Sequence, residues 1–365
     1  MEKFNLDNLV RENIKVLKPY SSARSEYMGS AKIFIDANEN SYGSPVVLPS
    51  TGEEGPDSKR EGMMLNRYPD PLQWQLKLEL SKIKGVPPQN IFIGNGSDEV
   101  IDIAYRIFCT PGKDNVIICP PTYGMYKVCA GINDIEVKEV LLTKDFQLDV
   151  KNILSAVDEN TKLLFICSPN NPTGNDMDRM DVESLLNNFP GIVMIDEAYI
   201  NFSRQKPFLQ ELTEYENLIV MQTLSKAWGL AALRLGLGFA SERIIDLFNN
   251  VKPPYNINEA SQQLGIQALV NIKEVNANIV NIVKQRNWIH DQLQQFDFVQ
   301  IIYTSDSNFV LVKVNDADKL YQYLLLNRII VRNRSKEPLC ENCIRITVGT
   351  QQENEILINI LKDYE

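Results

Sequence analysis

Short apolar runs alternate with helix-like stretches from about residue 91 onward. The runs are rich in β-branched residues and most are followed by a turn signal, a pattern typical of mainly parallel strands connected by helices. We expect strands at residues 91–93, 116–119, 163–167, 192–195 and 218–222. Functional loops should gather at the C-terminal ends of such strands.

Pro253 and Pro254 interrupt this pattern. Beyond them the sequence predicts two long helices and then a smaller α+β domain. The helices are expected at residues 258–270, 273–296, 316–327 and 351–364, and the strands at 299–302, 309–314, 329–332 and 344–348. We therefore predict an N-terminal arm (residues 1–40), a large α/β domain (41–255) and a small C-terminal domain (256–365).

Composition limits the classes of protein that fit. A chain of 365 residues, 44% of them hydrophobic, is long enough for about two domains and a substantial core. No apolar stretch approaches the roughly 20 residues that span a bilayer, and residues 1–11 do not resemble a signal peptide, so we expect a cytoplasmic protein. The net charge of −10 would repel a phosphate backbone, so no nucleic-acid partner is expected. The acidic, Gly- and Pro-rich segment from Gly43 to Gly62 predicts a mobile surface loop.

The cysteines and the single histidine give little support for a metal site, a redox site or histidine-based proton transfer. Cys340 and Cys343 form a C-x-x-C motif, but no second pair completes a metal site, so incidental thiols are favoured over a redox or metal role. The other cysteines mostly lie in apolar runs, where a reduced thiol packs as a small hydrophobic group. With His290 as the single histidine, proton transfer must come from another side chain, and lysine is a candidate.

The first motif that could carry chemistry is Ile-Phe-Ile-Gly-Asn-Gly-Ser-Asp-Glu at residues 91–99, a strand that runs into a helix near Asp98. Free backbone N–H groups at a helix start bind anions such as phosphate. The same residues are also common in turns and caps, and both interpretations stay open. A dinucleotide-binding G-x-G-x-x-G is not completed, because Glu99 stands at the third glycine position.

The second motif is Ser-Pro-Asn-Asn-Pro-Thr-Gly at residues 168–174, at the end of a predicted strand. Its prolines fix the turn and leave the Asn171 amide free to reach a ligand. A rigid turn without a ligand explains the spacing equally well.

The third motif is Ile-Val-Met-Ile-Asp-Glu-Ala-Tyr at residues 192–199, an apolar strand that ends in two carboxylates and a phenol. Such an acidic pair also occurs in nucleotide hydrolases. That interpretation fails, because no G-x-x-x-x-G-K-[ST] occurs in the chain to hold a triphosphate.

The fourth motif is Thr-Leu-Ser-Lys-Ala-Trp-Gly-Leu at residues 223–230, followed by Leu-Arg-Leu-Gly at 233–236. A lone lysine after a strand is usually a solvated charge. Here the hydroxyls of Thr223 and Ser225 and the guanidinium of Arg234 would supply phosphate ligands around the amine of Lys226.

In this order, at successive strand ends, the four motifs resemble those of fold-type I pyridoxal-phosphate enzymes. Additional segments resemble the histidinol-phosphate aminotransferase family, and the resemblance spans almost the whole chain. These segments are Lys-Pro-Tyr at 18–20, Ala-Asn-Glu-Asn at 37–40, Asn-Arg-Tyr-Pro at 66–69, Pro-Pro-Thr-Tyr-Gly-Met-Tyr at 120–126 and Arg-Ile-Thr-Val-Gly-Thr at 345–350. Two features depart from the family: the loop at 43–62 is longer than the family needs, and Trp228 stands where phenylalanine is expected.

The resemblance implies a role for each motif. Lys226 would bind pyridoxal 5'-phosphate as a Schiff base and move the substrate proton, and Asp196 would keep the pyridine nitrogen protonated. Asn171 and Tyr199 would hydrogen-bond the phenolic oxygen of the ring, and Tyr123 would stack on its face. The other implied cofactor-binding residues are Gly96, Ser97, Asp98, Thr223, Ser225, Arg234 and, from a second subunit of a homodimer, Tyr68.

The resemblance also implies the substrates. Arg332 and Arg345 would face the open side of the cofactor, where their forked donors suit both carboxylate and phosphate. Without the resemblance, Arg345 would be taken for a surface cation. Tyr20 and Asn38 would help to close the pocket. The implied reaction exchanges an amino group between L-glutamate and histidinol phosphate in histidine biosynthesis, with 2-oxoglutarate and imidazole acetol phosphate as the keto partners.

Three other functions are considered. A phospho-amino-acid decarboxylase would share the lysine, the aspartate and the phosphate ligands. An aminotransferase of broader specificity would also accept aromatic amino acids. A non-enzymatic cofactor sensor fused to a DNA-binding module is disfavoured, because the chain has no basic N-terminal helix-turn-helix.

Overall fold

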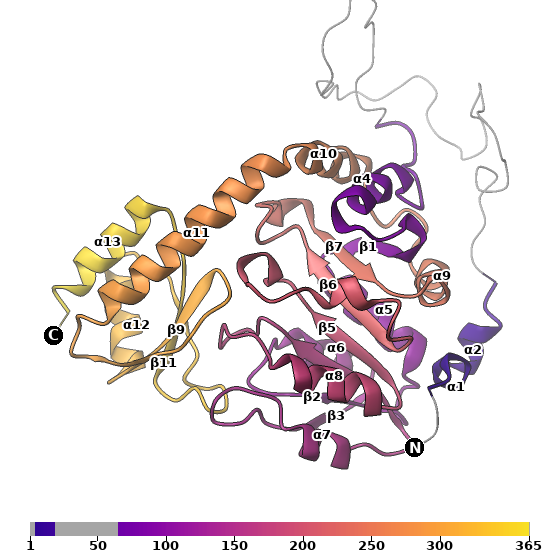
Figure 1. Cartoon of the computed structure of the whole chain (residues 1–365), viewed down its shortest axis with the longest axis horizontal. Coiled ribbons are helices and arrows are strands. Elements are labelled where there is room, and N and C mark those ends of the chain that lie inside the picture. The colour runs from indigo at the N-terminus through magenta and orange to yellow at the C-terminus, as the bar shows by residue number, and fades with distance from the viewer. Residues whose placement is uncertain (1–3, 19–64, 365) are drawn as a thin grey trace, which may run out of the picture.

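The computed structural model describes residues 4–18 and 65–364 (Figure 1). Tyr20, Asn38 and the predicted loop at 43–62 lie outside the described residues. Within the described part of the chain, the helices are too short or too polar to cross a membrane.

A seven-stranded sheet forms the centre of the larger half of the molecule, in the order β1-β7-β6-β5-β4-β2-β3. Neighbouring strands from β3 to β6 are parallel, whereas β7 is antiparallel to both β1 and β6. The prediction of a mainly parallel sheet is therefore confirmed. The strands are β1 (Ile91–Asn95), β2 (Asn115–Ile118), β3 (Glu136–Glu139), β4 (Thr161–Cys167), β5 (Ile192–Asp196), β6 (Leu218–Thr223) and β7 (Leu235–Phe239).

Apart from its charged edge strand β3, the sheet is buried on both faces because its strands are apolar almost throughout. In β5, Ile192 and Met194 face one hydrophobic cluster and Val193 and Ile195 face another, as the two-residue period of a strand requires. The first cluster includes residues of α5 (Ser97–Phe108), α6 (Met125–Ile132) and α9 (Glu242–Val251). The second includes residues of α4 (Trp74–Lys84), α7 (Val150–Ser155), α8 (Arg179–Asn188) and α10 (Glu259–Val270).

The described part of the predicted arm packs against the first of these clusters. It contains α1 (Leu6–Leu9) and α2 (Glu12–Lys15), and Leu6 and Val10 are buried against α5 and α9. Arg11 also donates from Nη1 to the carbonyl oxygen of Arg106, at 2.9 Å. Both apolar and polar contacts therefore fix α1 and the residues after it to the helices on this face of the large sheet. Short 3-10 turns elsewhere in the large half are η1 (Pro88–Asn90), η2 (Ile200–Phe202), η3 (Phe208–Glu211) and η4 (Ala231–Leu233).

A four-stranded antiparallel sheet, in the order β10-β11-β9-β8, forms the smaller half. Its strands are β8 (Val299–Ile302), β9 (Phe309–Val314), β10 (Arg332–Asn333) and β11 (Cys343–Thr347), packed with α12 (Ala317–Leu326) and α13 (Gln351–Leu361). The long helix α11 (Ile272–Leu293) connects the halves: it starts beside α10 and ends on the small sheet (Figure 1).

The structure corrects the predicted elements in three places. Strands β3 and β7 were not predicted, and the strand expected at 329–332 starts only at Arg332. Residue 329 instead closes the C-terminal cap of α12, because Arg328 is left-handed (φ 61°) and the Ile329 N–H donates to the carbonyl oxygen of Leu324 at 2.8 Å. Strand β7 contains two glycines, and Gly236 is required there: a Cβ on it would lie 2.0 Å from the carbonyl carbon of Gly96.

Candidate active site

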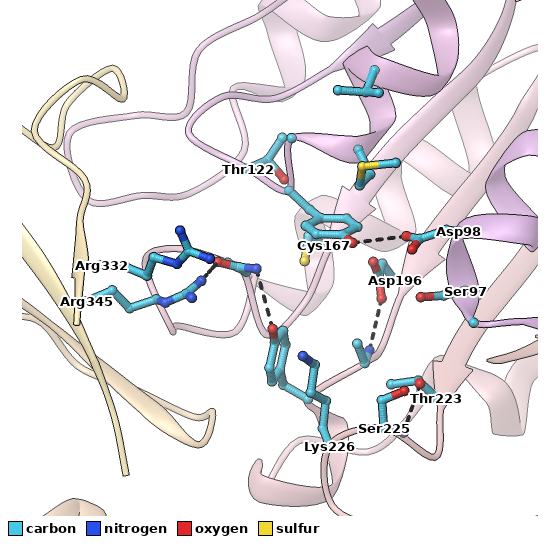
Figure 2. Close-up of a pocket in the computed structure, with 18 of the residues that line it drawn as sticks. Ser97, Asp98, Thr122, Cys167, Asp196, Thr223, Ser225, Lys226, Arg332 and Arg345 are labelled. Atoms are coloured by element: carbon cyan, nitrogen blue, oxygen red, sulfur yellow. Dashed lines mark hydrogen bonds between the residues drawn. The ribbon is translucent and has the colours of Figure 1, made fainter. Parts of the chain in front are cut away.

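A cavity of about 480 Å3 opens at the C-terminal ends of β4, β5 and β6. The structure brings most of the predicted site residues together around it. These are Gly96, Ser97, Asp98, Tyr123, Asn171, Asp196, Tyr199, Thr223, Ser225, Lys226, Arg234, Arg332 and Arg345. In Figure 2, Arg332 and Arg345 enter from the small sheet, Ser97, Asp98, Thr223 and Ser225 lie on the far side, and Lys226 and Asp196 lie between these groups.

Asp196 ends β5 and is held at both carboxylate oxygens. Its Oδ1 accepts from the Ala198 N–H at 3.0 Å, and its Oδ2 accepts from the Tyr126 hydroxyl at 2.7 Å. Asp196 is 3% exposed, and burial raises the pKa of its carboxyl group, which the hydrogen bond from Tyr126 partly counteracts. Asp196 is thus a fixed acceptor whose charged form would be stabilised by a cation bound beside it.

Lys226 lies just past the end of β6, with its Nζ 5.7 Å from the centre of the Tyr199 ring. Burial lowers the pKa of its amine, and the nearby Arg345 lowers it further, whereas Asp196 acts in the opposite direction. A lowered pKa leaves more of the amine neutral at a given pH, which is the form that attacks a carbonyl and accepts a proton.

The turn at 168–174 places Asn171 between the two halves of the molecule. Asn170 holds the turn by donating from Nδ2 to the carbonyl oxygen of Pro121 at 2.8 Å and to Oγ1 of Thr173 at 2.7 Å. Asn171 in turn donates from Nδ2 to the Tyr199 hydroxyl at 3.4 Å and accepts a hydrogen bond from Nη1 of Arg345. The Asn171 amide therefore does reach the cavity, where it can contact a ligand.

At the far side, the start of α5 offers donors for an anion. Its N-cap, Gly96, has a positive φ of 75° and supplies no capping side chain, so the first two N–H groups of the helix, those of Ser97 and Asp98, lack an intrahelical acceptor. A Cβ on Gly96 would lie 2.6 Å from Nη2 of Arg234, so glycine is what allows this guanidinium to approach the helix start. The hydroxyls of Ser97, Thr223 and Ser225 line the same end of the cavity.

Tyr123 and Asp98 form the wall between these donors and Asp196. The Tyr123 hydroxyl donates to Oδ1 of Asp98 at 3.0 Å, and Oδ2 of Asp98 lies 3.6 Å from Nη2 of Arg234. Burial raises the pKa of the Tyr123 phenol, and the Asp98 carboxylate raises it further, so the phenol stays protonated. Asp98 thus orients both a ring and a guanidinium.

The small sheet contributes a group of cations. Arg332 of β10 and Arg345 of β11 are directly paired across the two strands. Arg334 and Glu337, from the turn that follows β10, line the cavity beside them. Sequence reasoning missed these two residues and Tyr126. Tyr126 stands in the Pro-Pro-Thr-Tyr-Gly-Met-Tyr segment, and Arg334 stands two residues from Arg332, but neither position carried a separate signal.

Three predicted residues are not part of this cavity as described. Tyr20 and Asn38 lie outside the described residues. Tyr68 does not line the cavity; its ring stacks on that of Tyr255, with centroids 4.5 Å apart, and its side chain is 50% exposed.

The cavity fits pyridoxal phosphate by the chemistry of its groups. It has an amine for a carbonyl, a buried carboxylate for a ring nitrogen, and, at the opposite end, a glycine cradle with hydroxyls and a guanidinium for a phosphate ester. The fold and the site together define a pyridoxal-phosphate enzyme of the aminotransferase class. In agreement, residues 30–361 match the family model described as aminotransferase class I and II.

Similar proteins specify which family within aminotransferase class I and II the chain belongs to. The chain is 51% identical over 361 residues to the histidinol-phosphate aminotransferase of Cytophaga hutchinsonii and 50% identical over 361 residues to that of Bacteroides thetaiotaomicron, covering 99% of each chain in both cases. The chain therefore belongs to the histidinol-phosphate aminotransferase family.

Solved structures share the fold. The histidinol-phosphate aminotransferase of Clostridium acetobutylicum superposes with a TM-score of 0.75 at 23% identity, covering 82% of this chain and 90% of that one. The enzyme from Sinorhizobium meliloti, solved in complex with pyridoxal-5'-phosphate, superposes with a TM-score of 0.75 at 22% identity, covering 82% and 84%.

Proposed function

We propose that this enzyme transfers an amino group between L-glutamate and imidazole acetol phosphate, giving 2-oxoglutarate and L-histidinol phosphate in histidine biosynthesis. The observation that carries the proposal is the identity of about half of all positions with histidinol-phosphate aminotransferases over almost the full chain. The lining of the cavity supports it, because cations stand opposite the lysine where an anionic substrate group would bind.

Bound pyridoxal phosphate supplies the electron sink that stabilises negative charge at the substrate α-carbon. Lys226 would hold the cofactor covalently through its amine and, once released, move the proton from the substrate α-carbon. Asp196 would keep the ring nitrogen protonated, because a buried carboxylate favours a cation beside it. Asn171 and Tyr199 would donate to the phenolic oxygen of the ring, and Tyr123 would stack on the ring.

The remaining assignments concern the two ends of the cavity. Gly96, Ser97, Asp98, Thr223, Ser225 and Arg234 would bind or orient the phosphate of the cofactor. Arg332 and Arg345 would bind the carboxylate of glutamate and the phosphate of histidinol phosphate in turn, since a guanidinium fork matches both anions. Tyr20 and Asn38 would close the pocket.

A substrate panel tests the proposal. Purified enzyme is mixed with L-glutamate, and conversion of the cofactor to its pyridoxamine form is followed by absorbance. Turnover is then measured with histidinol phosphate and with phenylalanine. We expect conversion by glutamate and much faster turnover of histidinol phosphate. Comparable rates with phenylalanine would favour a broader aminotransferase.

A decarboxylase is the second candidate, because L-threonine-O-3-phosphate decarboxylase from Porphyromonas gingivalis shares the fold with a TM-score of 0.70 at 22% identity. Such an enzyme would release carbon dioxide from a phospho-amino acid and would not need glutamate. Failure of glutamate to convert the cofactor, together with carbon dioxide release, would overturn the proposed transamination.

We further propose a cytoplasmic homodimer in which Tyr68 reaches the cofactor phosphate of the partner. In support, large apolar side chains are exposed near Tyr68 and on the neighbouring helices α4 and α10, including Leu72, Trp74, Leu78 and Leu264. Size-exclusion chromatography with light scattering should give the mass of a dimer, and Leu78→Arg should shift the protein toward the monomer. A monomeric wild-type protein with full activity would contradict this assembly.

We also propose the division into an arm (residues 1–40), a large domain (41–255) and a small domain (256–365). In support, the two sheets fall on opposite sides of residue 255. Helix α10, just beyond that residue, packs against α4 of the large half, so the proposed boundary divides the two sheets but not all of the helices. Limited proteolysis tests the boundary, which should be cut in preference to sites within either sheet.

A further inference from the structure

At its small-sheet side the cavity holds two charged side chains in addition to the two predicted arginines. Arg332, Arg334 and Arg345 all line it, and the carboxylate of Glu337 lies among them. The four residues belong to β10, to β11 or to the turn between these strands. Neither Arg334 nor Glu337 has a task in the function proposed above.

The turn fixes Arg334 and brings Glu337 back to it. The Arg334 N–H donates to the carbonyl oxygen of Cys343 at 2.8 Å, and the Glu337 N–H donates to the carbonyl oxygen of Arg334 at 2.9 Å. Nη1 of Arg334 then lies 3.5 Å from Oε1 of Glu337, a long ion pair between half-buried side chains. Nε of Arg334 is buried and has no acceptor within the described residues. The guanidinium is therefore positioned by the backbone but only loosely paired.

Arg345, the neighbouring arginine, also has too few hydrogen-bond acceptors for its guanidinium group. Nε of Arg345 is also buried without an acceptor in the described part of the chain. Burial lowers the pKa of Arg345, and the positive charges of Arg334 and Arg332 lower it further. Like charges held this close repel one another, so an incoming anion relieves the repulsion as well as filling the empty donors.

We propose that Arg334 is a third anion-binding residue for the substrates. Glu337 is the internal anion of the site: its carboxylate pairs with Arg334 until an anionic group of the substrate replaces it. This inference rests on the proposed function and adds a determinant of specificity to it. Three guanidinium groups and one carboxylate leave two positive charges at this wall. A phosphate monoester carries a charge of about −1.5 to −2 at pH 7, and glutamate brings two carboxylates. The wall thus selects ligands with two negative charges over ligands with one.

Anion binding to the holoenzyme tests the inference without any turnover. Isothermal titration calorimetry with glutarate and with inorganic phosphate should show that Arg334→Gln weakens binding of both by about tenfold, the usual effect of losing a charge-assisted hydrogen bond. Butyrate, which has one carboxylate, should lose less affinity than glutarate. Arg334→Lys, which keeps the charge without the fork, should fall between wild type and Arg334→Gln.

Glu337→Gln tests the internal anion. It should strengthen glutarate binding severalfold in the wild-type background and have a much smaller effect in the Arg334→Gln background, because most of its effect acts through Arg334. Equal effects in both backgrounds would overturn the exchange of partners.

Lys336→Gln is the matched control for charge, since Lys336 is exposed, lies two residues from Arg334 and is outside the cavity lining. It should leave glutarate affinity within about twofold of wild type, as expected for a screened surface charge. If Arg334→Gln behaves like Lys336→Gln, the role of Arg334 is wrong. Absence of histidinol phosphate turnover with intact anion binding would instead count against the proposed function alone.

Discussion

The phenol of Tyr126 donates a hydrogen bond to Asp196, with 2.7 Å between its oxygen and Oδ2. Tyr126 is fully buried on α6, and the hydroxyl of Tyr105 donates to its backbone carbonyl oxygen at 2.8 Å. Because a buried carboxylate is costly unless it is hydrogen-bonded, this contact, together with that from the Ala198 N–H, stabilises the charged form of Asp196 beneath the cavity. Tyr126 is thus a positioning residue for Asp196.

Removing that hydroxyl should shift the pH dependence of activity. In Tyr126→Phe the pKa of Asp196 should rise, since the hydrogen bond from Tyr126 lowers it in the wild type. We expect kcat to fall by about tenfold and the acidic limb of the kcat profile to move to higher pH, as expected when a hydrogen bond to a charged group is lost. Tyr105→Phe is the control, because it removes a neighbouring buried hydroxyl that does not touch Asp196, and it should leave that limb in place. An unshifted limb in Tyr126→Phe would count against this role.

Replacing Lys226 should separate cofactor attachment from folding. Lys226→Ala should lose the visible absorbance of the lysine-bound cofactor and at least about a thousandfold in kcat, since no other amine lines the cavity in the described part of the chain. Tm should stay close to that of the wild type, because Lys226 is largely exposed to the cavity rather than packed in the core. Wild-type absorbance in the variant would refute the assignment of Lys226.

Arg345→Ala should act chiefly on substrate binding. The variant loses the hydrogen bond to Asn171 and a cation at the substrate end of the cavity. We expect kcat/KM for glutamate to fall by about a hundredfold, mainly through KM. The pKa of the free Lys226 amine should rise, because Arg345 lowers it in the wild type. Saturation curves that match the wild type would contradict this assignment.

The sequence predicted the strands that carry their own signal. β4, β5 and β6 are runs of β-branched and other apolar residues, and each was placed to within about two residues of its observed ends. β7 was missed because its two glycines lower strand propensity; it forms because β1 and β6 supply hydrogen-bonding partners on both sides. β3 was missed because Glu136 and Glu139 make it look like a polar loop, although an edge strand tolerates charge.

The site residues divide in the same way, into those that a local motif predicts and those that only the fold brings to the site. Residues in recognisable motifs at strand ends, such as Asp196 and Lys226, were predicted and lie at the cavity. Tyr126 could not be predicted, because its contact with Asp196 joins residues 70 positions apart and depends on which face of α6 meets β5. Arg334 likewise becomes a site residue only through the turn between β10 and β11. Long-range packing, rather than local pattern, decides these contacts.

A buried network beneath the site should make stability depend on pH. Glu197 accepts hydrogen bonds from the Phe208 N–H and from Nε2 of Gln222, whose Oε1 accepts from Nζ of Lys84 at 2.6 Å. Burial raises the pKa of Glu197 to about 7 and lowers that of Lys84 to about 8. The pKa of this carboxyl group is higher in the folded protein than its value of about 4.3 in the unfolded chain. The free energy of unfolding therefore falls as the pH rises from the unfolded pKa to the folded pKa, by at most about 1.4 kcal/mol per pH unit.

Glu197→Gln removes this titration while keeping the side chain's size. The Tm of the variant minus that of the wild type should therefore be larger at pH 8 than at pH 5.5, by a few degrees, when both are measured by calorimetry on the holoenzyme. Glu214→Gln, at an exposed position, should give the same difference at both pH values. If the difference for Glu197→Gln is also independent of pH, then Glu197 titrates as an ordinary carboxyl group and its burial is compensated by the amide of Gln222.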